Sequence, residues 1–306
     1  MNRSDPNQAP SVHRIVAGID GSRHALDAAL WAAALADRRG APMHLVHAFR
    51  SAGPTSLLGR AHADEYVQRR TGRGEALIDE ARREILARHP RVSVTGEVAE
   101  GDPARLLVAL SYDASLVCVG TRGYGGFTDL LLGSVSLRLA AHCHCPAVFV
   151  PARAARPAAA RDAALVLGVD EDEPDSVIGF AFRTAADLGL GVRAVHAWEP
   201  IELRPGYHLV EPVFLEEEAR VLLEGALKRA PLDQYPNVPV TTDAIRGGAA
   251  GALVGAVHAA PLIVIGGHRA RSAVSVGVGA VVHALLSHAT CPVAVVPAVL
   301  LSLPAA

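Results

Sequence analysis

A glycine-rich segment between residues 120 and 134 has the residue types and the spacing that hold phosphate groups in proteins. Gly120 and Gly123 stand three residues apart, and the pair Gly133-Ser134 follows after nine intervening residues. An apolar run leads into the segment and helical periodicity follows it, which predicts a strand, a loop and a helix. The unpaired N–H groups and the positive dipole end at a helix start favour an anion. Because the glycines allow close backbone approach and Ser134 adds a hydroxyl, the segment is predicted to bind phosphate.

The composition excludes other modes of phosphate binding. Lys228 is the only lysine of the chain, so there is no Gly-Lys-Ser or Gly-Lys-Thr of a Walker A loop. This lysine lies in a polar helical stretch that is unsuited to Schiff-base chemistry. The 29 basic and 31 acidic residues give a formal net charge of −2, which is too balanced for a nucleic-acid-binding protein. Phosphate is therefore expected to be held by backbone amides, hydroxyls or arginine.

Alternatives stay open for these residues. The glycine segment could be an ordinary connection between a strand and a helix, although nine intervening residues are many for such a loop. Asp20 follows an earlier apolar run and could either bind a ligand or cap the helix that begins near Ser22.

Histidine and cysteine residues form two further patterns. The run His142-Cys-His-Cys145 has the residue types of a metal site, but it alternates just before a predicted strand, so its neighbours point to opposite faces. Since a structural zinc site needs four converging ligands, no metal is expected. His47 and His196 end equivalent strands and are expected to be hydrogen-bonded structural residues rather than catalytic bases. The four cysteines are expected to be reduced and mostly buried.

The second half of the chain repeats the first. Residues 141–151 align with residues 287–297 at an offset of 146, and residues 18–20 align with residues 168–170 at an offset of 150. Drifting offsets are typical of two copies of one domain that differ by short deletions. We therefore predict a leader at residues 1–11, a first domain at 12–151, a linker at 152–162, a second domain at 163–298 and a tail at 299–306.

Each copy alternates apolar runs with helical stretches in the order βαβαβαβαβ. Strands that are apolar on both faces are typical of a parallel sheet covered by helices, so the fold class is α/β, with two tandem Rossmann-like domains. In the first copy the expected strands are residues 14–19, 43–49, 92–98, 116–120 and 147–150, and the expected helices are residues 23–39, 62–88, 103–112 and 134–142. In the second copy the expected helices are residues 175–188, 211–229, 249–258 and 280–288.

A ligand of such a sheet lies beyond the carboxyl ends of the strands, where the strand order reverses. Asp20, Ala48 and Gly120 all follow or end predicted strands. If the first, second and fourth strands are neighbours, these three positions converge on one crevice. The polar start of the chain has no signal-peptide core and no window reaches 18 uninterrupted apolar residues, so a cytoplasmic protein without a membrane span is expected.

The motifs Gly-Ile-Asp-Gly-Ser at residues 18–22 and G-x2-G-x9-G-S at residues 120–134 resemble those of the universal stress protein family in its tandem-domain bacterial form. The resemblance covers nearly the whole chain. It implies five strands in the order 3-2-1-4-5 in each domain and, for the ATP-binding branch, ATP with Mg²⁺ as the ligand. The implied binding residues are Gly120, Gly123, Gly133 and Ser134 for the phosphates and ribose, Val135 through its main chain, Gly18 and Asp20 for the nucleoside, and the Ala48 backbone for adenine.

The second copy departs from this pattern. Arg269 replaces the second glycine of the loop and Ala280 replaces the serine, so the second copy is expected to bind ATP weakly or not at all. The positions of this weak second site are Asp170, Ala197, Gly266 and Gly279. The acidic runs at residues 170–173 and 216–218 are expected to be solvated helix starts, and the first could repel a phosphate.

Three functions compete on the sequence alone. The first is an ATP-binding regulatory protein whose nucleotide occupancy is read by an unknown protein partner. The second is a weak ATPase or phosphotransferase, in which Asp20 or Asp129 helps to position a water. The third is an interaction scaffold without nucleotide. The resemblance also implies that the last strands of the two copies, residues 147–150 and 293–296, pair within the chain, and that two chains could form a homodimer.

Overall fold

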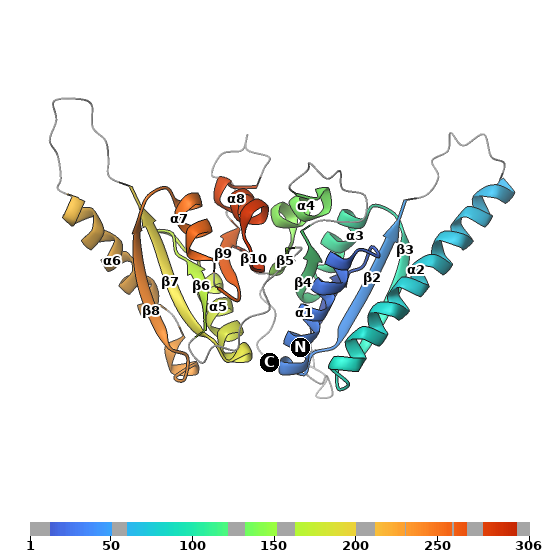
Figure 1. Cartoon of the computed structure of the whole chain (residues 1–306), viewed down its shortest axis with the longest axis horizontal. Coiled ribbons are helices and arrows are strands. Elements are labelled where there is room, and N and C mark those ends of the chain that lie inside the picture. The colour runs from blue at the N-terminus through green and yellow to red at the C-terminus, as the bar shows by residue number, and fades with distance from the viewer. Residues whose placement is uncertain are drawn as a thin grey trace, which may run out of the picture.

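The residues that the structure describes form ten strands and eight α-helices, and the strands make one continuous sheet (Figure 1). The structure is a computed structural model. It describes residues 13–50, 60–121, 132–151, 163–199, 212–229, 231–258, 260–267 and 278–298. The expected leader, linker and tail lie wholly outside these ranges.

The elements alternate along the chain as the sequence predicts. The strands are β1 Arg14–Gly18, β2 Met43–Phe49, β3 Val94–Glu100, β4 Ala114–Gly120, β5 Ala147–Val150, β6 Ala164–Gly168, β7 Gly191–Trp198, β8 Val240–Arg246, β9 Ile263–Gly267 and β10 Val293–Pro297. The helices are α1 Arg23–Arg39, α2 Arg60–Arg88, α3 Pro103–Leu110, α4 Ser134–His142, α5 Asp175–Leu188, α6 Pro212–Lys228, α7 Ala249–Ala256 and α8 Ala280–His288.

The sheet consists of two parallel halves joined by one antiparallel seam. Its strand order is β3-β2-β1-β4-β5-β10-β9-β6-β7-β8, so the order 3-2-1-4-5 occurs twice, once in each direction. At the seam β10 pairs with β5, and Ala294 lies opposite Val148. The predicted fold class, strand order and pairing of the last strands are therefore confirmed. Pairing β5 with β10 also gives each of these strands a hydrogen-bonded neighbour on both sides.

Helices cover both faces of the sheet. Helices α1, α2, α5 and α6 pack with one set of strand side chains, whereas α3, α4, α7 and α8 pack with the other. In β1, Ile15 and Ala17 point into the first layer and Val16 into the second, as strand geometry requires. Because both faces are covered, the strands are apolar on both sides.

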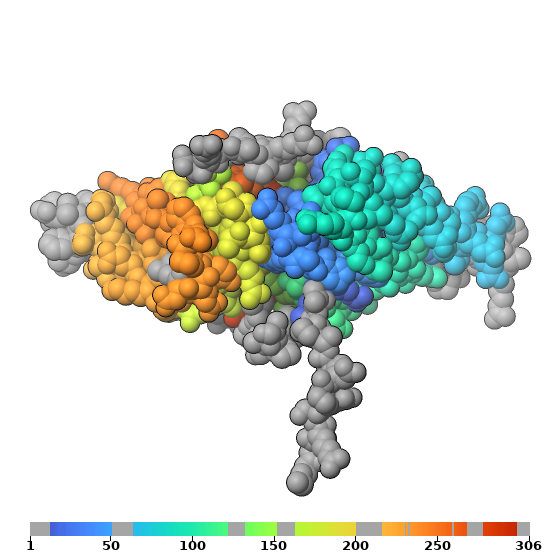
Figure 2. Space-filling view, turned by 90° about the horizontal axis from the view of Figure 1, so that it is seen from below, coloured from blue at the N-terminus to red at the C-terminus, as the bar shows by residue number. Residues whose placement is uncertain are grey.

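The two halves also meet through α1 and α5, which lie side by side near the middle of the molecule (Figure 2). Arg39 of α1 donates from Nε to Asp187 Oδ2 at 2.6 Å and from Nη2 to Thr184 Oγ1 at 3.2 Å. Its guanidinium also lies 5.9 Å from the ring centre of Phe180. The two halves are thus joined both by this contact and by the seam.

Candidate functional site

The carboxyl ends of β1, β2 and β4 meet at one edge of the sheet. Strand β1 lies between the other two, with Gly18 beside Val46 of β2 and Ala17 beside Cys118 of β4. The strand order also reverses here, because β2 and β3 lie on one side of β1 whereas β4 and β5 lie on the other. This arrangement brings Asp20, Ala48 and Gly120 to the same end of the sheet, as the sequence predicts. We call this place the first crevice, because a ligand of such a sheet is expected there.

Asp20 is held in place by the turn between β1 and α1. Its Oδ1 accepts a hydrogen bond from the Ser22 N–H at 2.9 Å, and Ser22 Oγ in turn accepts from the Ala25 N–H at 3.1 Å. The N-cap of α1 is therefore Ser22, so the alternative in which Asp20 caps this helix is wrong. Gly21 between them has φ +86°, a conformation that favours glycine. The turn thus fixes the Asp20 carboxylate beside the strand ends.

Gly120 is required by packing within the protein. A Cβ at this position would lie 2.9 Å from the His24 backbone carbon, because the first turn of α1 crosses directly over the end of β4. Gly18 is similarly close to the Leu107 and Val119 side chains, at 3.2 Å. These two glycines therefore permit close approach of neighbouring elements, whether or not a ligand is present.

The two ends of the glycine loop are fastened to each other. The Gly133 N–H donates to the Thr121 carbonyl at 3.0 Å, and the Ser136 hydroxyl lies 3.2 Å from the Gly120 carbonyl. Residues 122–131 are outside the described part of the chain, and so the predicted site residue Gly123, together with Asp129, is not placed. The described anchors nevertheless hold the start of α4 beside the end of β4.

The start of α4 has the features of an anion site. Gly133 is its N-cap and supplies no side-chain hydrogen bond to the helix. The N–H groups of the first turn, which includes Ser134 and Val135, have no intrahelical acceptor by helix geometry. Ser134 is exposed and Val135 is partly buried, so an anion can reach the N-terminus from the crevice.

Two arginines near the strand ends were not among the site residues predicted from the sequence. Arg50 directly follows β2 and donates from Nη2 to Asp102 Oδ2 at 2.7 Å, while Arg138 of α4 lies 3.7 Å from Asp102 Oδ1. The Arg105 N–H first, and then the Arg50 and Arg138 charges, hold the pKa of Asp102 below its ordinary value. Asp102 is thus a carboxylate that positions two cations near α4. The sequence did contain a signal that could have singled out Arg50, because it aligns with Glu199 and the charge at this position therefore reverses between the two copies.

The second half has no arginine at the two positions that align with Arg50 and Arg138. Glu199 follows β7 at the position of Arg50, and its Oε1 would lie 2.9 Å from a Cβ on Gly248, the N-cap of α7. The counterpart of Arg138 is Ala284. Arg269 lies outside the described residues, whereas Gly279 and Ala280 again start a helix without a side-chain cap.

Glu173 fills the space beside the end of β9. It is only 2% exposed, its Oε2 accepts from the Asp170 N–H at 3.2 Å, and its Oε1 lies against Gly266, where a Cβ has no room. The expectation that residues 170–173 form a solvated helix start is therefore wrong for Glu173. The turn before α5 is longer than the turn before α1, and this extra length lets the carboxylate fold inward. The run at residues 216–218 lies inside α6 rather than at its start.

The two histidines at the strand ends make identical hydrogen bonds. His47 Nδ1 lies 2.8 Å from the Ile19 carbonyl, and His196 Nδ1 lies 2.8 Å from the Val169 carbonyl. The predicted structural hydrogen bond is present in both halves. Ala197, the counterpart of Ala48, occupies the same place on β7 opposite Ile245. The frame around the two crevices is thus shared, and the charged residues differ.

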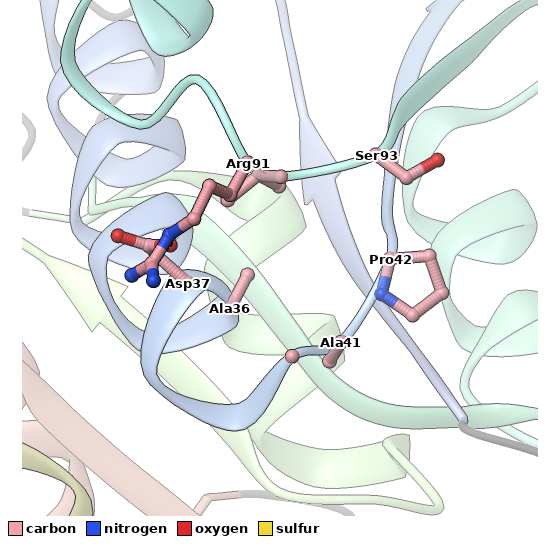
Figure 3. Close-up of a pocket in the computed structure, with 8 residues that line it drawn as sticks. Ala36, Asp37, Ala41, Pro42, Arg91 and Ser93 are labelled. Atoms are coloured by element: carbon pink, nitrogen blue, oxygen red, sulfur yellow. Dashed lines mark hydrogen bonds and ion pairs between the residues drawn. The ribbon is translucent and has the colours of Figure 1, made fainter.

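A separate hollow of about 280 Å³ lies at the opposite edge of the sheet (Figure 3). It is formed by the end of α1 and by the segments that lead into β2 and β3. Arg91 reaches across it to Asp37, with Nη2 3.0 Å from Oδ1. Since the amino ends of the strands line this hollow, it is distinct from the crevice at their carboxyl ends.

Among the described residues, no helix combines the length and the apolar character needed to cross a membrane.

Comparison with known proteins agrees with this architecture. A profile of the universal stress protein family matches residues 11–151 and, again, residues 158–297. Universal stress protein Rv2624c of Mycobacterium tuberculosis is 29% identical over 290 residues, which cover 94% of this chain and 97% of that protein. Universal stress protein Rv2623 of the same organism is 30% identical over 285 residues, covering 92% and 95%. A crystal structure of a universal stress protein from Archaeoglobus fulgidus shares the fold, with a TM-score of 0.68 at 16% identity over 94% of this chain and 100% of that one.

Proposed function

Because the chain belongs to the universal stress protein family, we propose that it is an ATP-binding regulatory protein that holds its nucleotide in the first half. The nucleotide lies at the carboxyl ends of β1, β2 and β4. Its phosphates bind at the start of α4, to the Ser134 and Val135 amides and the Ser134 hydroxyl. Asp20 meets the nucleoside, and the Ala48 backbone meets the adenine edge.

The observation that carries this proposal is the charge around the first crevice. The N-terminus of α4 is positive, and Arg50 and Arg138 share the single carboxylate of Asp102, so this group of side chains keeps a net positive charge beside α4. Arginine and helix amides are also the donors that remain for phosphate when the Walker lysine is missing. Mg²⁺ would be held chiefly by the phosphate oxygens and by water, as is usual for this ion.

The second half is proposed to bind ATP weakly or not at all. Glu173 and Glu199 place carboxylates at positions where the first half has a helix turn and an arginine. A phosphate beside these groups would face like charges. The chain would then hold one nucleotide, and a protein partner would distinguish the occupied from the empty first half.

Identification of the bound molecule tests this proposal directly. The full-length protein is purified without added nucleotide and denatured, and the released small molecules are identified by mass spectrometry. ATP or ADP at close to one per chain is the expected result. A chain that releases no nucleotide, and that also gives no binding heat when titrated with MgATP, contradicts the proposal. Sustained hydrolysis that Asp20→Ala abolishes while binding persists would instead favour an enzyme.

A further inference from the structure

Two cysteines lie together between α4 and β5. Cys143 is the C-cap of α4, with the extended backbone angles φ −64° and ψ 140°, and Cys145 stands two residues later, just before Pro146. Residues 144 and 145 form a bend between the helix and the strand. The Cys145 thiol lies 3.6 Å from the Pro146 carbonyl and is also within hydrogen-bonding reach of the Cys143 sulfur. The two sulfur atoms are therefore neighbours in the folded protein.

Neighbouring groups from α3 hold this segment in place. The hydroxyl of Ser111, the C-cap of α3, accepts from the His144 N–H at 3.0 Å. The His144 ring stacks on Tyr112, with the ring centres 3.7 Å apart. These contacts occupy the residue between the two cysteines and fix its backbone. The two thiols are thus held side by side by contacts that do not involve sulfur.

Cys143 differs from the other three cysteines in exposure and acidity. It is partly exposed, whereas Cys118, Cys145 and Cys291 are buried. Hydrogen bonding by the Cys145 thiol, helped by Ser111, lowers the pKa of Cys143 against the opposing effect of burial. Burial raises the pKa of Cys291 to about 12 and raises that of Cys118 still further. Cys143 is therefore the thiol that can most readily ionise and meet a reagent from solution.

The second half shows that the fold does not require this pair. Ala289 is the C-cap of α8 with nearly the same backbone angles, φ −63° and ψ 140°, and Cys291 occupies the place of Cys145. The same connection thus folds with one buried thiol. The additional thiol of the first half has no structural counterpart to explain it.

We propose that Cys143 and Cys145 form a reversible dithiol–disulfide site whose oxidant is a peroxide. The Cys143 thiolate attacks one peroxide oxygen, the O–O bond breaks, and hydroxide leaves, which gives a sulfenic acid on Cys143. The Cys145 sulfur then attacks Cys143, the S–O bond breaks, and the thiol proton leaves with the oxygen as water. With hydrogen peroxide the sum is two thiols and one peroxide giving one disulfide and two waters.

The short loop makes this disulfide easy to reduce. The ring closed by two cysteines that flank a single residue departs from relaxed disulfide geometry, and strained disulfides have the more oxidising potentials. A thiol reductant is therefore expected to restore the pair. This site does not depend on nucleotide binding, and it lies at the opposite end of α4 from Ser134.

Mass mapping of the full-length chain tests the proposal. The reduced protein is treated with hydrogen peroxide, denatured, alkylated and digested. The peptide that contains both cysteines is expected to lose two hydrogen atoms, to resist alkylation, and to recover with dithiothreitol. Before oxidation, Cys143 should alkylate at least about tenfold faster than Cys291, because it is both more exposed and more ionised. No disulfide, or one that forms only between chains, overturns the proposal.

Three variants separate the steps. Cys145→Ser should stop the reaction at a sulfenic acid on Cys143, which dimedone traps, and Cys143→Ala should leave Cys145 unoxidised. Oxidation of Cys145 without Cys143 contradicts the proposed order. Ala289→Cys in the second half is the matched gain-of-function variant, and it should create a second disulfide with Cys291. If this variant folds and forms none, the geometry at the helix end is not sufficient and the proposal fails.

Discussion

The two crevices share one backbone frame and differ in charge. Each has a glycine at the end of its fourth strand, a histidine that bonds the first strand, and a helix that starts without a side-chain cap. Around this frame the first half places Arg50 and Arg138, while the second places Glu173 and Glu199. The difference teaches that the fold determines where a ligand could lie, whereas a few rim residues determine whether an anion is accepted.

The shared glycines carry a related lesson. Gly120 touches the backbone of α1, and its counterpart Gly266 touches the Glu173 carboxylate. A glycine that recurs at this position in both halves is therefore explained by packing, and it gives only weak support for phosphate binding. The residues that differ between the halves are the better indicators of phosphate binding.

The largest expected effect is a difference in stability between alanine variants at Gly120 and at Gly266. Gly120→Ala places a Cβ 2.9 Å from the His24 backbone, which cannot move without shifting α1, so a loss of about 1–3 kcal/mol in the free energy of unfolding is expected. Gly266→Ala meets a side chain instead and should cost less. Gly179→Ala, at an open position in α5, is the control and should be neutral or stabilising. Urea denaturation measures all three, and equal losses for Gly120→Ala and Gly266→Ala would erase this distinction.

The second comparison concerns the turns before α1 and α5. Glu173→Ala removes a buried carboxylate and leaves the Asp170 N–H without its acceptor, so a loss of about 1–3 kcal/mol is expected. Glu173→Gln keeps an acceptor of the same size and should lose less. In the first half, Ser22→Ala removes only the helix cap and should cost about 1 kcal/mol. Thermal denaturation of the three variants ranks them, and an undiminished stability of Glu173→Ala would show that this carboxylate does not hold the turn.

A charge exchange at the rim tests the electrostatic difference. Arg50→Glu should weaken ATP binding about fivefold at low salt, since an exposed charge contributes roughly 1 kcal/mol. The effect should shrink as the salt concentration rises. The same reversal in the second half, Glu199→Arg, should leave the affinity of the first site unchanged. Equilibrium binding at two salt concentrations measures this, and an Arg50→Glu protein with wild-type affinity removes Arg50 from the site.

The smallest effect is a pH dependence confined to the first half. Burial, and then the Arg14 charge, lower the pKa of His44 against the opposing effect of Glu97, whose Oε2 lies 3.4 Å from Nε2. The unfolded chain therefore takes up a proton near pH 6.5 that the folded chain does not. This contribution to stability is complete above about pH 6.5 and is lost as the pH falls toward the lower pKa of the folded state.

The second half provides the contrast, because Arg193 and Asp243 form an ion pair at the positions of His44 and Glu97. His44→Gln should flatten the stability profile between pH 7 and pH 5. Denaturation midpoints across this range give the slope, and an unchanged slope in His44→Gln would assign the acid sensitivity to other groups.

Local signals in the sequence were sufficient to predict most of the fold. The bounds of α1 are correct because Ser22 caps its start and Gly40 takes the left-handed conformation at its end. Asp102 and Pro103 likewise set the start of α3. The internal repeat and the apolar strands predicted two copies of a parallel sheet covered by helices, whereas the strand order and the pairing of β5 with β10 were implied by the resemblance to the universal stress protein family.

The charges of the crevices could not be predicted in the same way. An acidic run ordinarily indicates a solvated surface, and the burial of Glu173 depends on a longer turn that folds against Gly266. The approach of Arg50 and Arg138 to Asp102 joins three elements that are distant in the chain. Such contacts become visible only when the strands and helices are assembled.

Titration of the full-length chain with MgATP tests the central claim most directly. Ser134→Asp and Ala280→Asp form a matched pair, because each adds one carboxylate at the first, exposed residue of an equivalent helix, where the helix itself tolerates it. The account predicts one site per chain for the wild type, none for Ser134→Asp, and one of unchanged affinity for Ala280→Asp. Two sites in the wild type, or a site lost through Ala280→Asp but kept in Ser134→Asp, would contradict it.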